Sequence, residues 1–152
     1  MRFSSVFVLA SLVVSSFAST AADVKADIVD ISAKLNTLDV SIYAFTLPGG
    51  TLSQALAIHT NAGPLITALN KGAADAVNVI PKPLSLADGR AILDSVEALE
   101  STIYHALNGI VARKNAFTAL PIGGIPALVK QDLASLNVAT QALEAGLIGS
   151  AP

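Results

Sequence analysis

Apolar side chains recur along most of the chain at alternating steps of three and four residues, which places them on one face of a helix. The first stripe covers residues 24–45 and stops at Leu47-Pro48-Gly49-Gly50, where proline and glycine favour a turn. A second stripe covers residues 52–76. Gly63-Pro64 interrupts it, and because proline has no N–H for the helical bond, we expect a bend or two separate segments there.

A third stripe covers residues 86–117 and predicts one uninterrupted helix of roughly 30 residues, the longest element of the chain. Ser85 and Asp88 have the spacing of a capping pair and predict that this helix begins at Leu86. Residues 121–126, rich in proline and glycine, separate it from a final helix of which Pro126 would be the first residue.

These patterns predict an all-α fold, an antiparallel up-and-down bundle of four long helical stretches, or five if the second splits at Gly63-Pro64. Residues 19–152 are enough for a single domain with one core. Three apolar side chains fall on the connections, Leu47, Ile122 and Ile125. Each would either cover a helix end or offer an exposed contact to a hydrophobic surface.

The first 18 residues are typical of a secretory signal peptide. Arg2 precedes an apolar run, and Ser16-Phe17-Ala18 offers the small residues that a cleavage site requires. We expect cleavage after Ala18, with Ala21 or Ala22 as alternatives. No later stretch is long and apolar enough for a transmembrane anchor, so we expect a secreted protein that is extracellular or associated with a cell wall.

Composition narrows the possible functions. Hydrophobic residues make up 53% of the chain and charged residues 13%, with a formal net charge of -2, which argues against nucleic acid as a partner. There is no cysteine, and neither histidine has the glutamate three residues earlier that a di-metal bundle uses. Nucleotide-binding and hydrolase motifs are missing as well. We therefore expect no enzyme activity, no cofactor, no catalytic residue and no metal site.

Three polar residues interrupt the apolar stripes: His59, Glu100 and Asp132. His105 projects away from the stripe of its helix and should be solvated. In one interpretation the three stripe residues lie at stripe edges or satisfy one another, since an unpaired buried charge is costly. In the other, some of them line a cavity and bind the polar head of an apolar ligand.

The apolar stripes consist mainly of Leu, Ile, Val and Ala, and such residues either pack closely or leave a channel. If there is a channel, we expect His59 to be the preferred hydrogen-bond donor to a lipid head group, with Glu100 orienting its ring. The candidate ligand-binding residues are His59, Ala62, Ile66, Val96, Glu100, Ile103, Tyr104 and Leu107.

Residues 23–147 resemble the fungal hydrophobic surface-binding protein A family, which includes cell-wall galactomannoproteins. The most specific similarity is in residues 114–143, at Phe117, Leu120-Pro121, Gly123-Gly124-Ile125 and Leu128 to Leu133. The segment from Asp27 to Leu38 is similar too.

The resemblance implies a secreted, helical, non-enzymatic protein that associates with hydrophobic surfaces or with lipids, and holds a fatty acid inside the bundle. It also implies secreted enzymes or cell-wall polymers as further partners. The alternative is a structural or antigenic cell-wall protein without a specific small ligand. No catalytic residue is carried over from the family.

Overall fold

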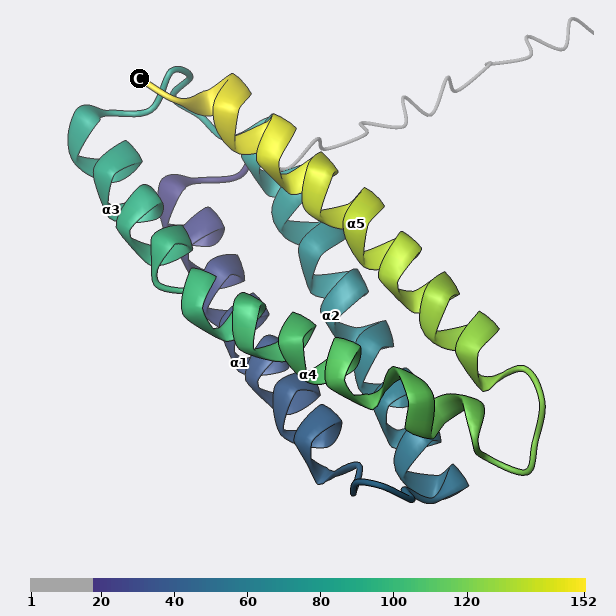
Figure 1. Cartoon of the computed structure of the whole chain (residues 1–152). Coiled ribbons are helices and arrows are strands. Elements are labelled where there is room, and N and C mark those ends of the chain that lie inside the picture. The colour runs from purple at the N-terminus through teal and green to yellow at the C-terminus, as the bar shows by residue number, and fades with distance from the viewer. Residues whose placement is uncertain (1–17) are drawn as a thin grey trace, which may run out of the picture.

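The computed structural model describes residues 18–152, so the predicted signal peptide lies outside the described residues except for Ala18. Within this part of the chain five α-helices follow one another, and the predicted all-α class is confirmed (Figure 1). Their bounds are α1 Ala21–Ala44, α2 Leu52–Asn78, α3 Leu86–Glu97, α4 Glu100–Thr118 and α5 Ile125–Ser150.

Short polar side chains define where the helices begin. Thr20 and Thr51 each accept a hydrogen bond from the backbone three residues later, and in both cases the later side chain bonds back to the threonine N–H. Ser85 accepts a hydrogen bond from the N–H of Asp88, as the sequence predicts for the start of α3. Before α5 the chain turns through Gly124, whose φ of 99° is accessible chiefly to glycine.

The possibility that the second helix splits at Gly63-Pro64 is wrong, because α2 runs unbroken through both residues. Both are exposed, so the carbonyl of Thr60 that Pro64 leaves without a helical donor also faces the solvent side. The buried residues Ala62 and Leu65 flank this point on the opposite face and keep both halves of the helix on one core.

The single long helix expected over residues 86–117 is also wrong, because it is divided into α3 and α4 at Ala98 and Leu99. There the N–H of Leu99 donates to the carbonyl of Val96, only three residues earlier, at 3.0 Å. Ser95 donates its hydroxyl to the carbonyl of Ala91, a side-chain bond that commonly bends helices. The turn leaves Leu99 buried.

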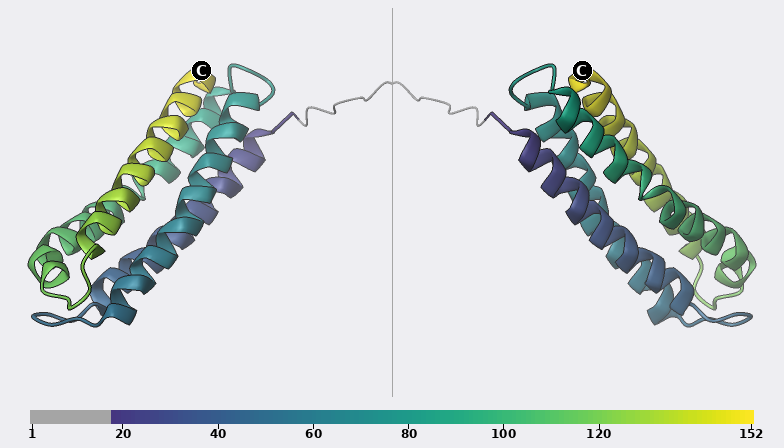
Figure 2. Two further views of the ribbon diagram at one scale, coloured as in Figure 1. Left: turned by 90° about the vertical axis from the view of Figure 1, so that its right-hand side faces the viewer. Right: turned by 90° about the vertical axis from the view of Figure 1, so that its left-hand side faces the viewer.

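Successive arms of the bundle reverse direction, with α3 and α4 together forming the third arm (Figures 1 and 2). The arms are not packed in chain order, however. The principal contacts join α1 to α2, α2 to α5, and α1 to both α3 and α4, so the connection after α2 crosses to the diagonally opposite corner. As a consequence α2 and α5 are parallel neighbours, as Gly72 beside Leu143 and Gly146 beside Ala73 show.

The core consists of the predicted stripes. Val24, Ile28 and Ile42 of α1 are at most 2% exposed, and burying such a side chain contributes about 1.5–3 kcal/mol. Of the three apolar residues on the connections, Ile125 is buried, whereas Leu47 and Ile122 are half exposed. No helix in residues 18–152 combines the length and the hydrophobicity that a membrane span requires.

Helices α2 and α5 approach closely because Gly146 has no side chain. A Cβ at this position would lie 3.0 Å from the carbonyl oxygen of Ala73 and 3.1 Å from the Cβ of Ala76. Since the first of these is a backbone atom within a helix, it cannot move aside without moving α2.

A polar network joins residue 19 to α1 and α2. Ser19 donates its hydroxyl to Asp75 at 2.6 Å, and Lys71 donates to Asp27 at 2.6 Å and to Asp75 at 2.7 Å. The bonds from Lys71 and Ser19 lower the pKa of Asp75 to about 2. Burial raises the pKa of Asp27. The hydrogen bond between Lys71 and Asp27 is in turn the first cause of the raised pKa of Lys71.

We predict that Gly146→Ala destabilises the protein by about 1–3 kcal/mol, because the added methyl group must separate α2 from α5. Urea unfolding followed by circular dichroism measures the effect. Gly149→Ala on the same helix is the matched control, since a Cβ there meets nothing nearer than 3.9 Å, and it should be neutral or slightly stabilising. Equal stabilities of the two variants would contradict close packing at Gly146.

A second prediction concerns acid stability. The pKa of Asp75 is lower in the folded chain than in the unfolded one, so its stabilising contribution is present above about pH 4 and is lost as the pH falls towards 2. We therefore compare the unfolding free energy of wild type with that of Asp75→Asn. The advantage of wild type should be up to about 2 kcal/mol larger at pH 5 than at pH 2. Burial, the first cause of the raised pKa of Asp27, acts in the opposite direction in both proteins.

The control for this experiment is Asp30→Asn, which removes an exposed partner of Lys34 within α1 and should change stability little at any pH. If the unfolding free energies of wild type and Asp75→Asn differ by the same amount at pH 5 and at pH 2, ionisation of Asp75 does not contribute to acid stability.

Candidate functional site

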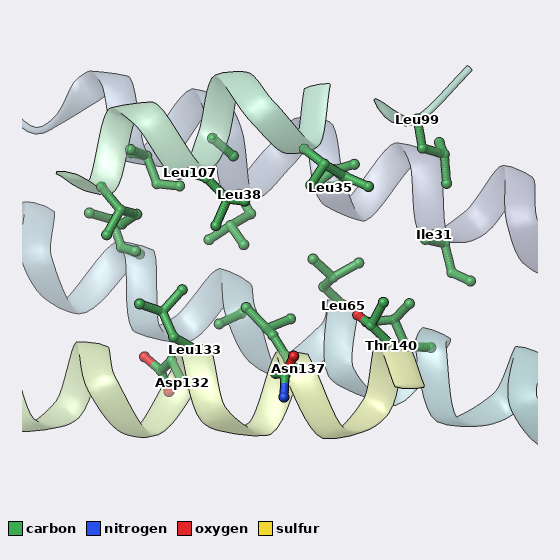
Figure 3. Close-up of a pocket in the computed structure, with 18 of the residues that line it drawn as sticks. Ile31, Leu35, Leu38, Leu65, Leu99, Leu107, Asp132, Leu133, Asn137 and Thr140 are labelled. Carbon is green, nitrogen blue, oxygen red and sulfur yellow. The ribbon is translucent and has the colours of Figure 1, made fainter. Parts of the chain in front are cut away.

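An elongated cavity of about 350 Å³ lies inside the bundle (Figure 3). All four arms contribute to its wall, together with Leu99 from the turn between α3 and α4. Its aliphatic lining residues are Ile28, Ile31, Leu35, Leu38, Ile42, Ile58, Ala62, Leu65, Leu69, Val96, Leu99, Ile103, Ala106, Leu107, Ile110, Val129, Leu133, Leu136 and Leu143. The structure therefore contains a channel where the sequence left close packing and a channel as alternatives.

The cavity follows from uneven packing around the bundle. Helices α2 and α5 and helices α1 and α2 pack against each other extensively, whereas α4 and α5 have little contact. The stripes of α4 and α5 are therefore partly separated, and apolar side chains face the space between them. Ile103 and Leu107 line the cavity yet remain 40% and 45% exposed, which indicates that it reaches the surface beside α4.

Three polar residues line the cavity, and all three belong to α5: Asp132, Asn137 and Thr140. In Figure 3 Asp132 lies towards the end marked by Leu107 and Leu133, whereas Thr140 lies towards the other end. Ligand pockets commonly combine an apolar wall with a few polar groups that fix the orientation of the ligand. Here those groups are confined to one side of the wall.

The structure brings four of the eight candidate ligand-binding residues to the cavity wall: Ala62, Val96, Ile103 and Leu107. The other four do not line it. Glu100 and Tyr104 lie on the exposed face of α4, and His59 is exposed at the edge of the α2 stripe. Ile66 lines a separate, shallow hollow between α2 and α5.

His59 and Asp132 are partners. Both carboxylate oxygens of Asp132 lie 3.0 Å from Nδ1 of His59, and this pair connects α2 to α5. The expectation that polar stripe residues satisfy one another is thus confirmed for these two. The expectation that Glu100 orients His59 is wrong, because the break at Leu99 and the helical phase of α4 place Glu100 on the solvent side.

A second pair of the same chemistry lies away from the cavity. Nδ1 of His105 is 2.8 Å from a carboxylate oxygen of Asp39, and its ring stacks on Tyr43 with centroids 4.0 Å apart. The His105 side chain is 55% exposed, as the sequence predicts. Among residues 18–152, no three His, Cys, Asp or Glu side chains gather as a possible metal site.

A buried cation supports the end of the bundle where α1 stops. Arg113 donates Nε–H to the carbonyl of Phe45 at 2.9 Å and bonds the carbonyls of Gly109 and Tyr43 as well. The bonds to Tyr43 and Phe45 satisfy carbonyl groups at the C-terminus of α1, where a helix has no internal donors, whereas Gly109 belongs to α4 itself. Arg113 does not line the cavity, so its role in this structure is to hold α4 against α1.

Residues 21–149 match the family described as Hydrophobic surface binding protein A, and the chain belongs to that family. A solved structure of AfMP4p in complex with palmitic acid is similar, with a TM-score of 0.77 and 31% sequence identity. The similarity covers 87% of this chain and 82% of that one. A comparison with curated proteins gave no match.

Sequence reasoning missed most of the wall. The α1 side of the cavity comes from stripe residues that periodicity identifies as buried, but periodicity does not distinguish a wall from a packed core. Sequence reasoning does not identify Asn137 and Thr140, although both lie within about one turn of Leu136, which also lines the cavity. Polar residues at such stripe edges are the signal that could have revealed them.

Proposed function

We propose that this chain is a secreted, non-enzymatic binding protein that holds one single-chain lipid, such as a fatty acid, in the cavity between its helices. The observation that carries the proposal is the aliphatic cavity of about 350 Å³, within the size range of roughly 300–1,000 Å³ found for ligand pockets. A long alkyl chain suits this wall because each buried CH₂ contributes about 0.8 kcal/mol.

The similarity to AfMP4p supports an alkyl chain as the ligand, since that protein was solved with palmitic acid. We therefore take a fatty acid as the first ligand to test. The non-enzymatic part of the proposal is supported by the wall itself, which is aliphatic except for three residues on α5. Such a wall offers mainly apolar contact, and the one carboxylate that it contains, Asp132, is bonded to His59.

Association with hydrophobic surfaces is the second part of the proposed function. Leu86, Leu93, Tyr104 and Val111 of the third arm are between 51% and 82% exposed. Apolar side chains exposed in this way can contact a hydrophobic surface while the bundle stays folded. Secretion and association with cell-wall polymers or secreted enzymes complete the proposal and are supported by the predicted signal peptide and the family.

We predict that Ala62→Phe blocks the cavity. Ala62 is 2% exposed and lies on the wall, so a phenyl ring there would occupy the space that the alkyl chain needs. Delipidated protein should take up labelled palmitic acid, and the variant should bind it at least about tenfold more weakly, equivalent to about 1.4 kcal/mol. Equilibrium dialysis measures both affinities.

Ala57→Phe is the matched control, because Ala57 is on the exposed face of the same helix and does not line the cavity. It should bind palmitic acid like wild type, and circular dichroism should show both variants to be folded. If wild type takes up no fatty acid, the lipid-binding proposal fails; if folded Ala62→Phe binds as well as Ala57→Phe, the cavity is not the binding site.

A further inference from the structure

Ser19 is bound to the C-terminal end of α2. It is 8% exposed, whereas the preceding Ala18 is exposed. The N–H of Ser19 donates to the carbonyl of Asn78 at 3.2 Å, and its carbonyl accepts from the N–H of Ile80 at 2.8 Å. Its hydroxyl donates to Asp75. Within residues 18–152, burial therefore begins one residue after the predicted signal peptide.

The helix end that Ser19 meets is electrically negative. The last carbonyls of a helix have no internal donors, and the helix dipole adds a partial negative charge there. The last turn of α2 has no basic residue and contains Asp75. Lys82, from the following connection, donates to the carbonyl of Val77 at 3.2 Å, so this helix end accommodates a cation.

The carboxylates beside this helix end are also short of positive charge. Asp23 and Asp27 both lie close enough to Asp75 and Lys71 to be influenced by their charges. Lys71 is bonded to two of these three carboxylates, those of Asp27 and Asp75. Oδ2 of Asp27 is buried and has no hydrogen-bond partner within residues 18–152. A further positive charge here would be stabilising, because opposite charges attract more strongly where water is partly excluded.

Cleavage after Ala18 creates such a charge. Hydrolysis of the Ala18–Ser19 peptide bond consumes one water and releases the carboxylate of Ala18 and the α-ammonium group of Ser19. This group has three donors and stays charged below about pH 7.7. Since the nitrogen and hydroxyl oxygen of one serine are at most about 4 Å apart, the charge lies within about 7 Å of the Asp75 carboxylate.

Only this one of the three predicted cleavage positions preserves the contacts. Cleavage after Ala21 or Ala22 removes Ser19 with all its bonds, together with Thr20, whose side chain caps α1. It also places the new ammonium group on the first turn of α1, at the positive end of that helix dipole.

We infer that the mature chain begins at Ser19 and that its α-ammonium group binds between the carbonyl of Asn78 and the carboxylate of Asp75. Removal of the signal peptide thus adds an ion pair that the uncut chain lacks, and the bundle is most stable after processing. The inference rests on the secretion part of the proposed function and is independent of lipid binding.

The first experiment determines the N-terminus of the full chain expressed in a eukaryotic secretion host. Intact mass and N-terminal sequencing of the secreted protein should give Ser19 as the first residue. Secreted protein that begins at Ala22 or Asp23 would overturn the inference alone. A chain that remains uncut inside the cell would overturn the proposed secretion as well.

The second experiment tests the ammonium group itself. Chains from Ser19 to Pro152 are prepared with a free or an acetylated N-terminus, and urea unfolding at pH 6.5 is followed by circular dichroism. Acetylation removes the charge but keeps an N–H for the carbonyl of Asn78. The free form should have an unfolding equilibrium constant at least about fivefold smaller. Equal constants would overturn the proposed ion pair.

Two kinds of control locate the effect. In chains that begin at the exposed Ala18, the ammonium group is one residue further out, so acetylation should change the constant by less than about twofold. Asp75→Asn should likewise reduce the effect of acetylation to about twofold or less. Asp30→Asn, which removes an exposed partner of Lys34, should leave the effect unchanged. If acetylation destabilises all four chains equally, the charge has no specific site and the inference is wrong.

Discussion

The architecture depends on the fact that some pairs of helices pack much more closely than others. Gly146 brings α5 into contact with α2, whereas α4 and α5 have little contact with each other. The apolar stripes of all the arms nevertheless face inward, because the interior between the arms is where their aliphatic side chains are removed from water. The apolar side chains are therefore mostly shielded from water, but those of α4 and α5 do not fully contact one another. The space left between them is the cavity.

This arrangement explains which features the sequence predicts. Helix positions follow from the three-and-four spacing of residues such as Ile28 and Ile31, together with the cap at Ser85, and these are local properties. The break at Leu99 has neither proline nor glycine to mark it. Its local feature is Ser95, whose hydroxyl bonds the carbonyl of Ala91, but a serine within a helix does not by itself predict a break.

Less of the candidate site than of the fold could be predicted, because the site depends on how the arms pack and not on local sequence. Ala62 and Leu107 belong to stripes, so their inward positions follow from periodicity, but the volume beside them depends on distances between helices. The mutual bond of His59 and Asp132 joins residues 73 positions apart and depends on α2 and α5 being parallel neighbours. Short connections alone favour neighbours in chain order, and this bundle does not follow that order.

Affinity and selectivity should therefore have different structural origins in this family member. Each CH₂ contributes about 0.8 kcal/mol wherever it meets the wall, so three CH₂ groups outweigh one hydrogen bond of about 0.5–1.5 kcal/mol. For the lipid ligand that we propose, chain length should therefore contribute most of the affinity. Between lipids of equal length, by contrast, the apolar term cancels. What remains is the interaction of the head group with its surroundings, and the polar groups of the wall, Asp132, Asn137 and Thr140, all belong to α5.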